Sequence, residues 1–277
     1  MMEHFYIITN EGKDENHKIT EQVARFLENE GRTWASSMPG VLGRGAVPEV
    51  PADTDCALVI GGDGTFLQAA RKLFGTEIPL LGINMGTLGY LTEVEVHHVE
   101  EGLNQLLSGN YTIESRMMLY GSIHEKHRDV AFNDIVVTRN GPLRVLQFNL
   151  YVNGAFLNSY QADGILVSTP NGSTAYNLSA GGPIVEPTAS LLVVTPICPH
   201  ALNSSSIILS DEDEIVIEIG SRRNQDTEAA VTFDGEDVTV LHTGDRVHIR
   251  KAWQTTRIVK LNKISFLETL REKLKGN

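Results

Sequence analysis

The stretch from residue 56 to residue 75 constrains the fold more than any other part of the sequence. Its apolar start, 56–60, predicts a buried strand, the run GGDGT at 61–65 predicts a tight turn, and residues 66–74 have the apolar spacing of a helix. A strand that ends in glycines at a helix start leaves backbone N–H groups without partners, next to the positive end of the helix dipole. Such a turn is suited to binding a phosphate group.

Asp63 is an unusual residue for a turn that only binds anions, because its carboxylate would repel them. We therefore expect it to take part in chemistry, as a carboxylate beside phosphates that accepts a proton or orients a hydroxyl. An ordinary tight loop explains the same five residues, with glycine supplying positive φ and Asp63 capping the helix. The short motif alone leaves both interpretations open.

The composition limits the kinds of partner. The chain has 277 residues, of which 41% are hydrophobic and 21% charged, so it can bury a core in one large domain or in two of ordinary size. The 35 acidic and 23 basic side chains give a formal net charge of −12, which opposes nonspecific binding to nucleic acid or to an anionic membrane. A small polyanion is not excluded, because backbone amides, a few arginines and Mg²⁺ can make a site locally positive.

Cysteine spacing and the apolar runs bear on metal binding and location. Cys56 and Cys198 lie far apart in apolar runs, so we expect two reduced core residues and no metal site of the protein's own. No apolar run approaches the roughly 20 residues of a membrane span, and residues 1–9 lack the features of a signal peptide. The expected protein is cytoplasmic, with no nucleic-acid partner and no membrane partner.

The first hundred residues alternate between strand and helix. Strands are predicted at 5–9, 56–60 and 78–84, with amphipathic helices over 19–27, 66–74 and 99–107. Alternation of this kind implies a parallel sheet with helices on its faces. Ligands of such sheets bind beyond the carboxyl ends of the strands, where the GGDGT turn would lie.

From about residue 119 the pattern turns to strands separated by turn residues. The clearest strands are predicted at 130–138, 145–152, 164–168 and 214–219, with further alternation at 229–233 and 245–250. Phe266, Leu267, Leu270 and Leu274 then predict a closing helix.

The predicted fold class is α/β plus all-β. An N-terminal Rossmann-like α/β domain is followed by a β-rich domain, and the C-terminal helix returns to the first domain, whose helical character it shares. The predicted first domain comprises residues 1–118 with 262–277, and the second comprises residues 119–261.

A second group of polar residues surrounds the strand predicted at 164–168. Asp163 precedes it, and the run STPNGSTAY at 168–176 leads from it into a short helix predicted at 173–181. The hydroxyls, amides and acid of this run can form hydrogen bonds with a ribose or with the edge of a base. A helix capped by serine or threonine explains the same residues equally. Asn133 and Asp134 are also unusual, because both are poor strand formers; they mark a bulge, an edge or a ligand contact.

Taken together, these segments resemble those of the NAD kinases. The GGDGT turn is shared with diacylglycerol and sphingosine kinases and, more loosely, with 6-phosphofructokinases. The runs from Ala162 to Pro183 and from Pro196 to Leu202 resemble NAD kinases specifically. The resemblance covers most of the chain from residue 56 to about 250, and it implies an α/β domain followed by a β-rich domain.

The resemblance also implies roles for residues at matching positions. Asp63 matches the acid that accepts the proton of the adenosine 2′-hydroxyl of NAD. Asp134 stands in the family's Asn-Glu pair, where Asp is one methylene shorter, and Asn171 stands where the family commonly has Thr, with little consequence expected. The implied NAD-binding residues are Asp63, Gly64, Asn133, Asp134, Arg144, Gln161, Asp163, Thr174, Ala175, Tyr176 and Ser179.

The implied activity is transfer of a phosphoryl group from ATP or polyphosphate to NAD, giving NADP. Gly62, Gly64 and Thr65 are expected to bind the phosphates of the donor, because the sequence has no Walker Gly-Lys-Ser/Thr element. The resemblance further implies a divalent metal, Mg²⁺, bound with the nucleotide, and a homodimer or homotetramer. Two alternatives stay open: a lipid or sugar kinase that shares the GGDGT turn, and a dinucleotide-binding sensor without catalysis.

Overall fold

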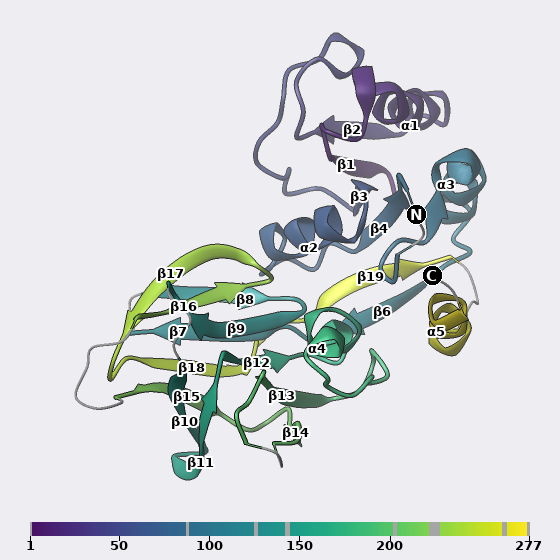
Figure 1. Cartoon of the computed structure of the whole chain (residues 1–277). Coiled ribbons are helices and arrows are strands. Elements are labelled where there is room, and N and C mark those ends of the chain that lie inside the picture. Colours follow the sequence, from purple (N-terminus) through teal and green to yellow (C-terminus); the bar gives the residue numbers. More distant parts are fainter. Residues whose placement is uncertain are drawn as a thin grey trace. The chain divides into compact units, whose positions relative to one another are not determined.

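The structure is a computed structural model that describes residues 2–86, 89–124, 127–141, 145–201, 204–221, 228–261 and 265–275. Its chain divides into two compact units, Met1–Ser115 with Thr256–Asn277, and Arg116–Thr255. The first unit is built on a largely parallel sheet with helices, and the second on antiparallel strands (Figure 1). The C-terminal helix belongs to the first unit, so the predicted fold class is confirmed.

The boundaries between the units lie a few residues from the predicted ones. The first falls after residue 115 rather than 118, and the second falls after residue 255 rather than 261. The larger difference concerns β19 (Thr256–Lys260), which pairs in parallel with β4 (Leu80–Asn84) and so joins the first sheet. The prediction placed residues 256–260 in the β-rich domain, because a local sequence pattern does not show which sheet a strand joins.

The sheet of the first unit has its described strands in the order β2 (Thr33–Ser36), β1 (His4–Thr9), β3 (Cys56–Gly61), β4, β19 and β6 (Thr112–Arg116), with β5 (Val94–Glu95) beside β4. The strands from β2 to β19 run parallel to one another. β3 and β4 are buried along their whole length, as expected for parallel strands whose two faces are both covered.

Three helices cover the faces of this sheet. They are α1 (Lys18–Asn29), α2 (Asp63–Lys72) and α3 (Val99–Leu107). α1 and α3 share a core cluster with Ile83 of β4. α2 packs Phe66 against Gly82. Gly82 and Ile83 are successive residues of β4 and so lie on opposite faces of the sheet, which places α2 on the face opposite to α1 and α3.

The strand order reverses between β1 and β3, because the chain runs from β1 to β2 on one side and then to β3 on the other. Ligands of open parallel sheets bind beyond the carboxyl ends of the strands at such a point. The GGDGT turn follows β3 there, and residues 10–14 form the turn that follows β1. The two turns lie side by side, since the N–H of Asn10 donates to the carbonyl of Ile60 at 2.9 Å.

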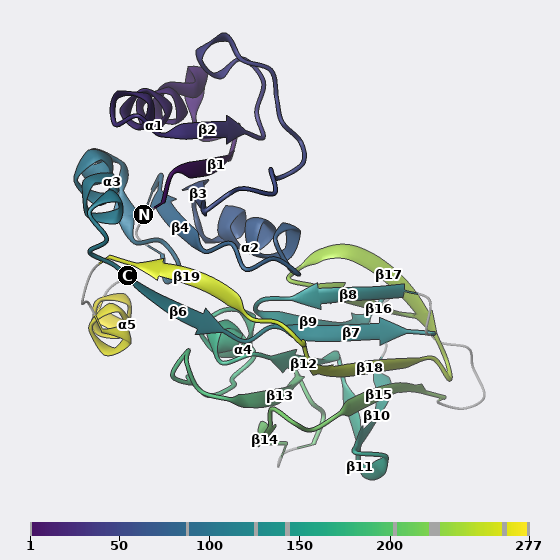
Figure 2. The same cartoon turned by 180° about the vertical axis from the view of Figure 1, so that it is seen from behind.

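The second unit contains two antiparallel sheets (Figure 2). Both sheets contribute to one core cluster, through Phe148 and Ile217 of one sheet and Val137 and Ile165 of the other. The described strands of one sheet are, in order, β11 (Ala155–Ala162), β10 (Leu146–Val152), β15 (Ile215–Gly220), β18 (Arg246–Lys251), β7 (Leu119–Ile123) and β8 (His127–Ala131). Those of the other are β14 (Ile207–Ser210), β13 (Leu191–Ile197), β12 (Gly164–Ser168), β9 (Asp134–Arg139), β16 (Glu228–Phe233) and β17 (Glu236–His242).

Local differences from the predictions occur where polar residues interrupt the pattern. The single strand predicted at 130–138 is two strands, β8 and β9, and the helix predicted at 173–181 is a 3₁₀ turn, Asn171–Thr174, followed by α4 (Tyr176–Ser179). Cys56 is buried as expected, but Cys198 is exposed with φ of 46°, because it follows the end of β13.

The closing helix α5 (Phe266–Lys275) forms where it was predicted, but its side chains are not buried. Leu267 and Leu274 are 70% and 66% exposed. Within the described ranges, no helix combines the length and the apolar character needed to cross a bilayer.

Candidate active site

The GGDGT turn joins the end of β3 to the first turn of α2. Gly61 is the last residue of the strand, Gly62 is extended, and the helix begins at Asp63, three residues earlier than predicted. Among the described residues, no side chain caps this helix start, and nothing lies within 4 Å of the point where a side chain on Gly64 would begin. The start of α2 is therefore uncapped and uncrowded at Gly64, as a phosphate site requires.

The carboxylate of Asp63 is held by backbone groups of the segment after β4. One oxygen accepts a hydrogen bond from the N–H of Tyr90 at 3.0 Å, and the other accepts one from the N–H of Leu91 at 3.3 Å. Gly89 lies so close that a Cβ on it would overlap the carboxylate. Each carboxylate oxygen retains a lone pair, so a side chain fixed in this way can still accept a hydrogen bond from a substrate hydroxyl.

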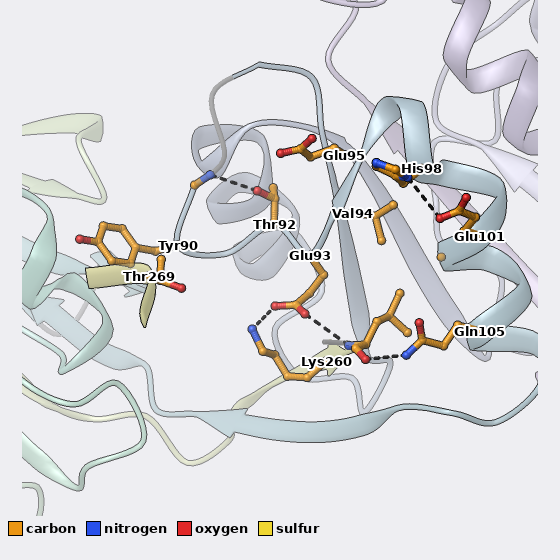
Figure 3. Close-up of a pocket in the computed structure, with 13 residues that line it drawn as sticks. Tyr90, Thr92, Glu93, Val94, Glu95, His98, Glu101, Gln105, Lys260 and Thr269 are labelled. Atoms are coloured by element: carbon orange, nitrogen blue, oxygen red, sulfur yellow. Dashed lines mark hydrogen bonds and ion pairs between the residues drawn. The ribbon is translucent and has the colours of Figure 1, made fainter. Parts of the chain in front are cut away.

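The same segment lines a cavity of about 330 Å³ within the first unit (Figure 3). In this cavity Glu93 and Lys260 of β19 form a largely buried ion pair, and burial lowers the pKa of Lys260. The ring of Tyr90 lies 6.4 Å from the ring of Phe266 in α5, measured between centroids. The segment that holds Asp63 is thus tied to β19 by this ion pair and lies next to α5.

In the second unit, Asp234 fixes the backbone that links β8 to β9. Its carboxylate accepts hydrogen bonds from the N–H groups of Phe132 and Asn133, both at 2.7 Å, and of Asp134 at 3.2 Å. The amide of Asn171 donates to the side-chain oxygen of Asn133 at 2.8 Å. Asn171, which stands where the family commonly has Thr, is thus in direct contact with Asn133.

A cavity of about 400 Å³ in the second unit brings together four of the residues predicted to bind NAD, namely Asn133, Asp134, Ala175 and Tyr176. The prediction missed the other lining residues, which are Val136, Thr138, Thr232, Asp234 and Gly235. The period of a strand could have found two of them, because residues 134, 136 and 138 of β9 share one face.

The charge of this cavity depends on pH near neutrality. Asp134 is only 5% exposed, and burial together with the nearby carboxylate of Asp234 raises its pKa to about 7. Burial also raises the pKa of Tyr176, with smaller contributions from Cys198, Asp134 and Asp163. A protonated Asp134 can donate a hydrogen bond, whereas the ionised form only accepts.

Asp134→Asn should remove a pH dependence from the stability of the protein. The ordinary pKa of this carboxyl is 3.8 and its folded value is about 7, so the folded state binds the extra proton between these values. The free energy of unfolding therefore falls as the pH rises from about 4 to about 7, by at most about 1.4 kcal/mol per pH unit. Chemical denaturation between pH 5 and pH 8 measures the slope, and equal slopes in wild type and variant would contradict the raised pKa.

The other predicted NAD-binding residues of the second unit are not part of the described lining of this cavity. Asp163 forms an ion pair with Arg139, with 3.2 Å between Nε and the carboxylate. Of the rest, Gln161 and Ser179 are exposed, Thr174 is half-buried, and Arg144 lies outside the described residues.

Two stretches of the chain match the two parts of one family. Residues 41–111 match the family described as ATP-NAD kinase N-terminal domain, and residues 132–261 match ATP-NAD kinase C-terminal domain. The chain belongs to the ATP-NAD kinase family. The resemblance predicted from the GGDGT turn and from residues 162–183 is therefore confirmed.

Relatives of known name agree with membership of the ATP-NAD kinase family. The NAD kinase of Lachnospira eligens is 45% identical over 294 residues, covering 99% of this chain and 100% of the relative. The NAD kinase of Agathobacter rectalis is 46% identical over 284 residues, covering 100% and 99%.

Two solved structures share the fold. Yeast NADH kinase complexed with NADH superposes with a TM-score of 0.87 at 24% identity, over 100% of this chain and 88% of that one. An NAD kinase from Archaeoglobus fulgidus in complex with ATP superposes with a TM-score of 0.80 at 23% identity, over 99% and 100%.

Proposed function

We propose that this protein is an NAD kinase, which transfers the terminal phosphoryl group of ATP to the adenosine 2′-hydroxyl of NAD and so produces NADP. The observation that carries the proposal is the carboxylate of Asp63, fixed by two backbone N–H groups at the first residue of α2, in a chain of the ATP-NAD kinase family. Relatives named NAD kinase are similar over almost their whole length, which supports the same substrate.

In the proposed reaction, Asp63 aligns the 2′-hydroxyl and accepts its proton. The bond between the 2′-oxygen and the terminal phosphorus forms while the bond from that phosphorus to the ADP oxygen breaks. The transition state is loose, so positioning and charge stabilisation contribute most of the rate enhancement. Gly62 and Gly64 present backbone amides to the donor's phosphates, and Thr65 presents its amide and hydroxyl.

The cavity of the second unit is the proposed surface for part of the dinucleotide. Asn133 and Asp134 offer an amide and a carboxyl group whose backbone is already fixed, and Tyr176 offers an aromatic ring on which a base can stack. Ala175 lines the same cavity. The remaining proposed contacts are Gly64, Gln161, Asp163, Thr174 and Ser179, together with Arg144.

The residues fit a divalent metal that is bound mainly through the nucleotide. Among the described residues, no three His, Cys, Asp or Glu side chains gather as a metal cage. Mg²⁺ in kinases is usually held by one or two carboxylates, by water and by the substrate's phosphates, and Asp63 and Thr65 are the oxygen ligands that the GGDGT turn offers. The metal would supply neutralisation of the negative charge on the phosphates.

The phosphoryl donor, the oligomeric state and the location in the cell are proposed from the family. ATP or polyphosphate serves as donor, the protein acts as a homodimer or homotetramer, and it works in the cytoplasm, where NAD and ATP are available. Sedimentation velocity of the purified protein measures the assembly, and a monomer at micromolar concentration would contradict that part.

The test of the function is NADP formation from NAD, ATP and Mg²⁺ by the purified protein. The expected result is turnover that stops when EDTA removes the metal and returns when Mg²⁺ is restored in excess. Turnover of diacylglycerol, sphingosine or a sugar with none of NAD would favour the lipid or sugar kinase. Binding of NAD without turnover by any donor would favour the sensor.

A further inference from the structure

A lysine outside the GGDGT motif lies directly over it. The ammonium nitrogen of Lys13 is 3.1 Å from the position that a Cβ on Gly62 would occupy. Lys13 is exposed, and among the described residues its ammonium has no hydrogen-bond partner and no ion pair. A free cation thus lies beside the turn that is proposed to bind the donor's phosphates.

Hydrogen bonds hold the turn that carries Lys13 in place. The N–H of Lys13 donates to the carbonyl of Asn10 at 3.0 Å, and the side-chain amide of Asn10 donates to the hydroxyl of Thr65 at 3.2 Å. On its other side, the buried carboxylate of Asp14 accepts hydrogen bonds from the N–H groups of Ile19 and Thr20, both at 2.9 Å. The turn is therefore anchored to α2 at one end and to α1 at the other.

The topology explains why these two turns meet. Residues 10–14 follow β1 and the GGDGT turn follows β3, and these two strands flank the point at which the strand order reverses. Loops at that point carry the ligand contacts of open parallel sheets. A phosphate bound at the start of α2 would therefore lie close to the positively charged side chain of Lys13.

The chemistry favours a polyphosphate chain over other ligands. Acidic side chains of the same turn do not neutralise the ammonium: Asp14 is directed into α1, and Glu11 and Glu15 form no ion pair with Lys13 in the described structure. A lysine ammonium and several backbone N–H groups are together the donors that P-loop proteins use for the β- and γ-phosphates. This chain lacks the P-loop lysine, and Lys13 supplies a cation from a different strand end.

We propose that Lys13 binds the terminal phosphates of the phosphoryl donor, a residue role that rests on the proposed kinase function. The alternative is that Lys13 is an ordinary solvent-exposed lysine that lies near the turn without binding a ligand. The two differ in what they predict for donor binding and for NAD binding.

The experiment compares Lys13→Ala and Lys13→Arg with wild type, and uses Arg25→Ala as a control. Arg25 is an exposed cation on α1 that pairs with Glu21, so its removal changes the net charge equally without touching the turn. We expect Lys13→Ala to raise the KM for ATP by about 10- to 100-fold, the range for a hydrogen bond to a charged group, with the KM for NAD almost unchanged. Lys13→Arg should restore most of the affinity, and Arg25→Ala should behave as wild type.

A direct titration separates this proposal from the proposed function. Calorimetric titration of ATP with Mg²⁺ into protein without NAD needs no turnover, so it tests Lys13 even if the wild type makes no NADP. Equal affinities of wild type and Lys13→Ala for ATP would overturn the proposal. An equal loss of ATP and NAD affinity in Lys13→Ala would also overturn it, because that result indicates a structural role; circular dichroism checks that each variant folds.

Discussion

Asp63→Asn is expected to lower the kcat of NADP formation by about 10²- to 10⁴-fold, the usual contribution of a general base. Asparagine has the size of aspartate, and its one remaining oxygen can still accept a hydrogen bond from Tyr90 or Leu91. Its amide cannot take the proton of the 2′-hydroxyl. We therefore expect the affinity for NAD to stay close to that of the wild type while turnover collapses, as measured by steady-state kinetics and by titration with NAD.

The chain offers a matched control for this variant. Asp55 is a carboxylate of the same unit that also accepts two backbone hydrogen bonds, from Glu3 at 2.7 Å and His4 at 3.0 Å, but it lies at the opposite end of β3. Asp55→Asn should affect stability and leave kcat unchanged. A kcat near the wild-type value in Asp63→Asn would show that Asp63 is not the proton acceptor.

Gly89→Ala is expected to lower kcat by about 10²-fold, although residue 89 carries no reactive group. The new methyl group would overlap the carboxylate of Asp63, so either that side chain or the 89–91 segment must move. A displacement of about 1 Å at a reacting group can reduce the rate by about 10²-fold, because catalysis depends on near-attack geometry. Steady-state kinetics measures the loss, and we expect the KM for ATP to change little because the GGDGT backbone stays in place.

Gly45→Ala is the control for the glycine substitution. The Cβ at position 45 would have no atom of the described structure within 4 Å, and the residue does not need a positive φ. Its kinetics should match those of the wild type. A Gly89→Ala enzyme with unchanged kcat would indicate that Asp63 tolerates the displacement, and would remove the 89–91 segment from the mechanism.

The sequence was enough to predict the elements with a strong period. The buried strand, glycine turn and helix around residues 56–74 form as expected, because an apolar run, glycines and a 3.6-residue spacing all agree there. The short strand β2 and the sheet to which β19 belongs could not be predicted. Strand pairing joins residues far apart in the chain, and a local pattern holds no information on the partner.

In the candidate site, too, some residues could be predicted from the sequence and others could not. Asp63 could be singled out because a carboxylate would repel the phosphate that a glycine-rich turn of this kind binds. The groups that position it, the backbone N–H groups of Tyr90 and Leu91, carry no residue-specific signal and could not be found by inspection of side chains. Asp234 was also missed, because its three amide partners lie about a hundred residues earlier in the chain. Lys13 escaped notice for the same reason, since only the fold brings it to Gly62.

The late position of β19 in the chain has a consequence for protein synthesis. β19 lies between β4 and β6 in the first sheet, yet the ribosome makes it only after the complete second unit. Domains usually fold in the order of their synthesis, but here the unit that begins first lacks an internal strand until residues 256–260 emerge. We expect the second unit to fold first on the nascent chain. The ion pair of Lys260 with Glu93 also forms only then, so the segment that holds Asp63 gains this support late in synthesis.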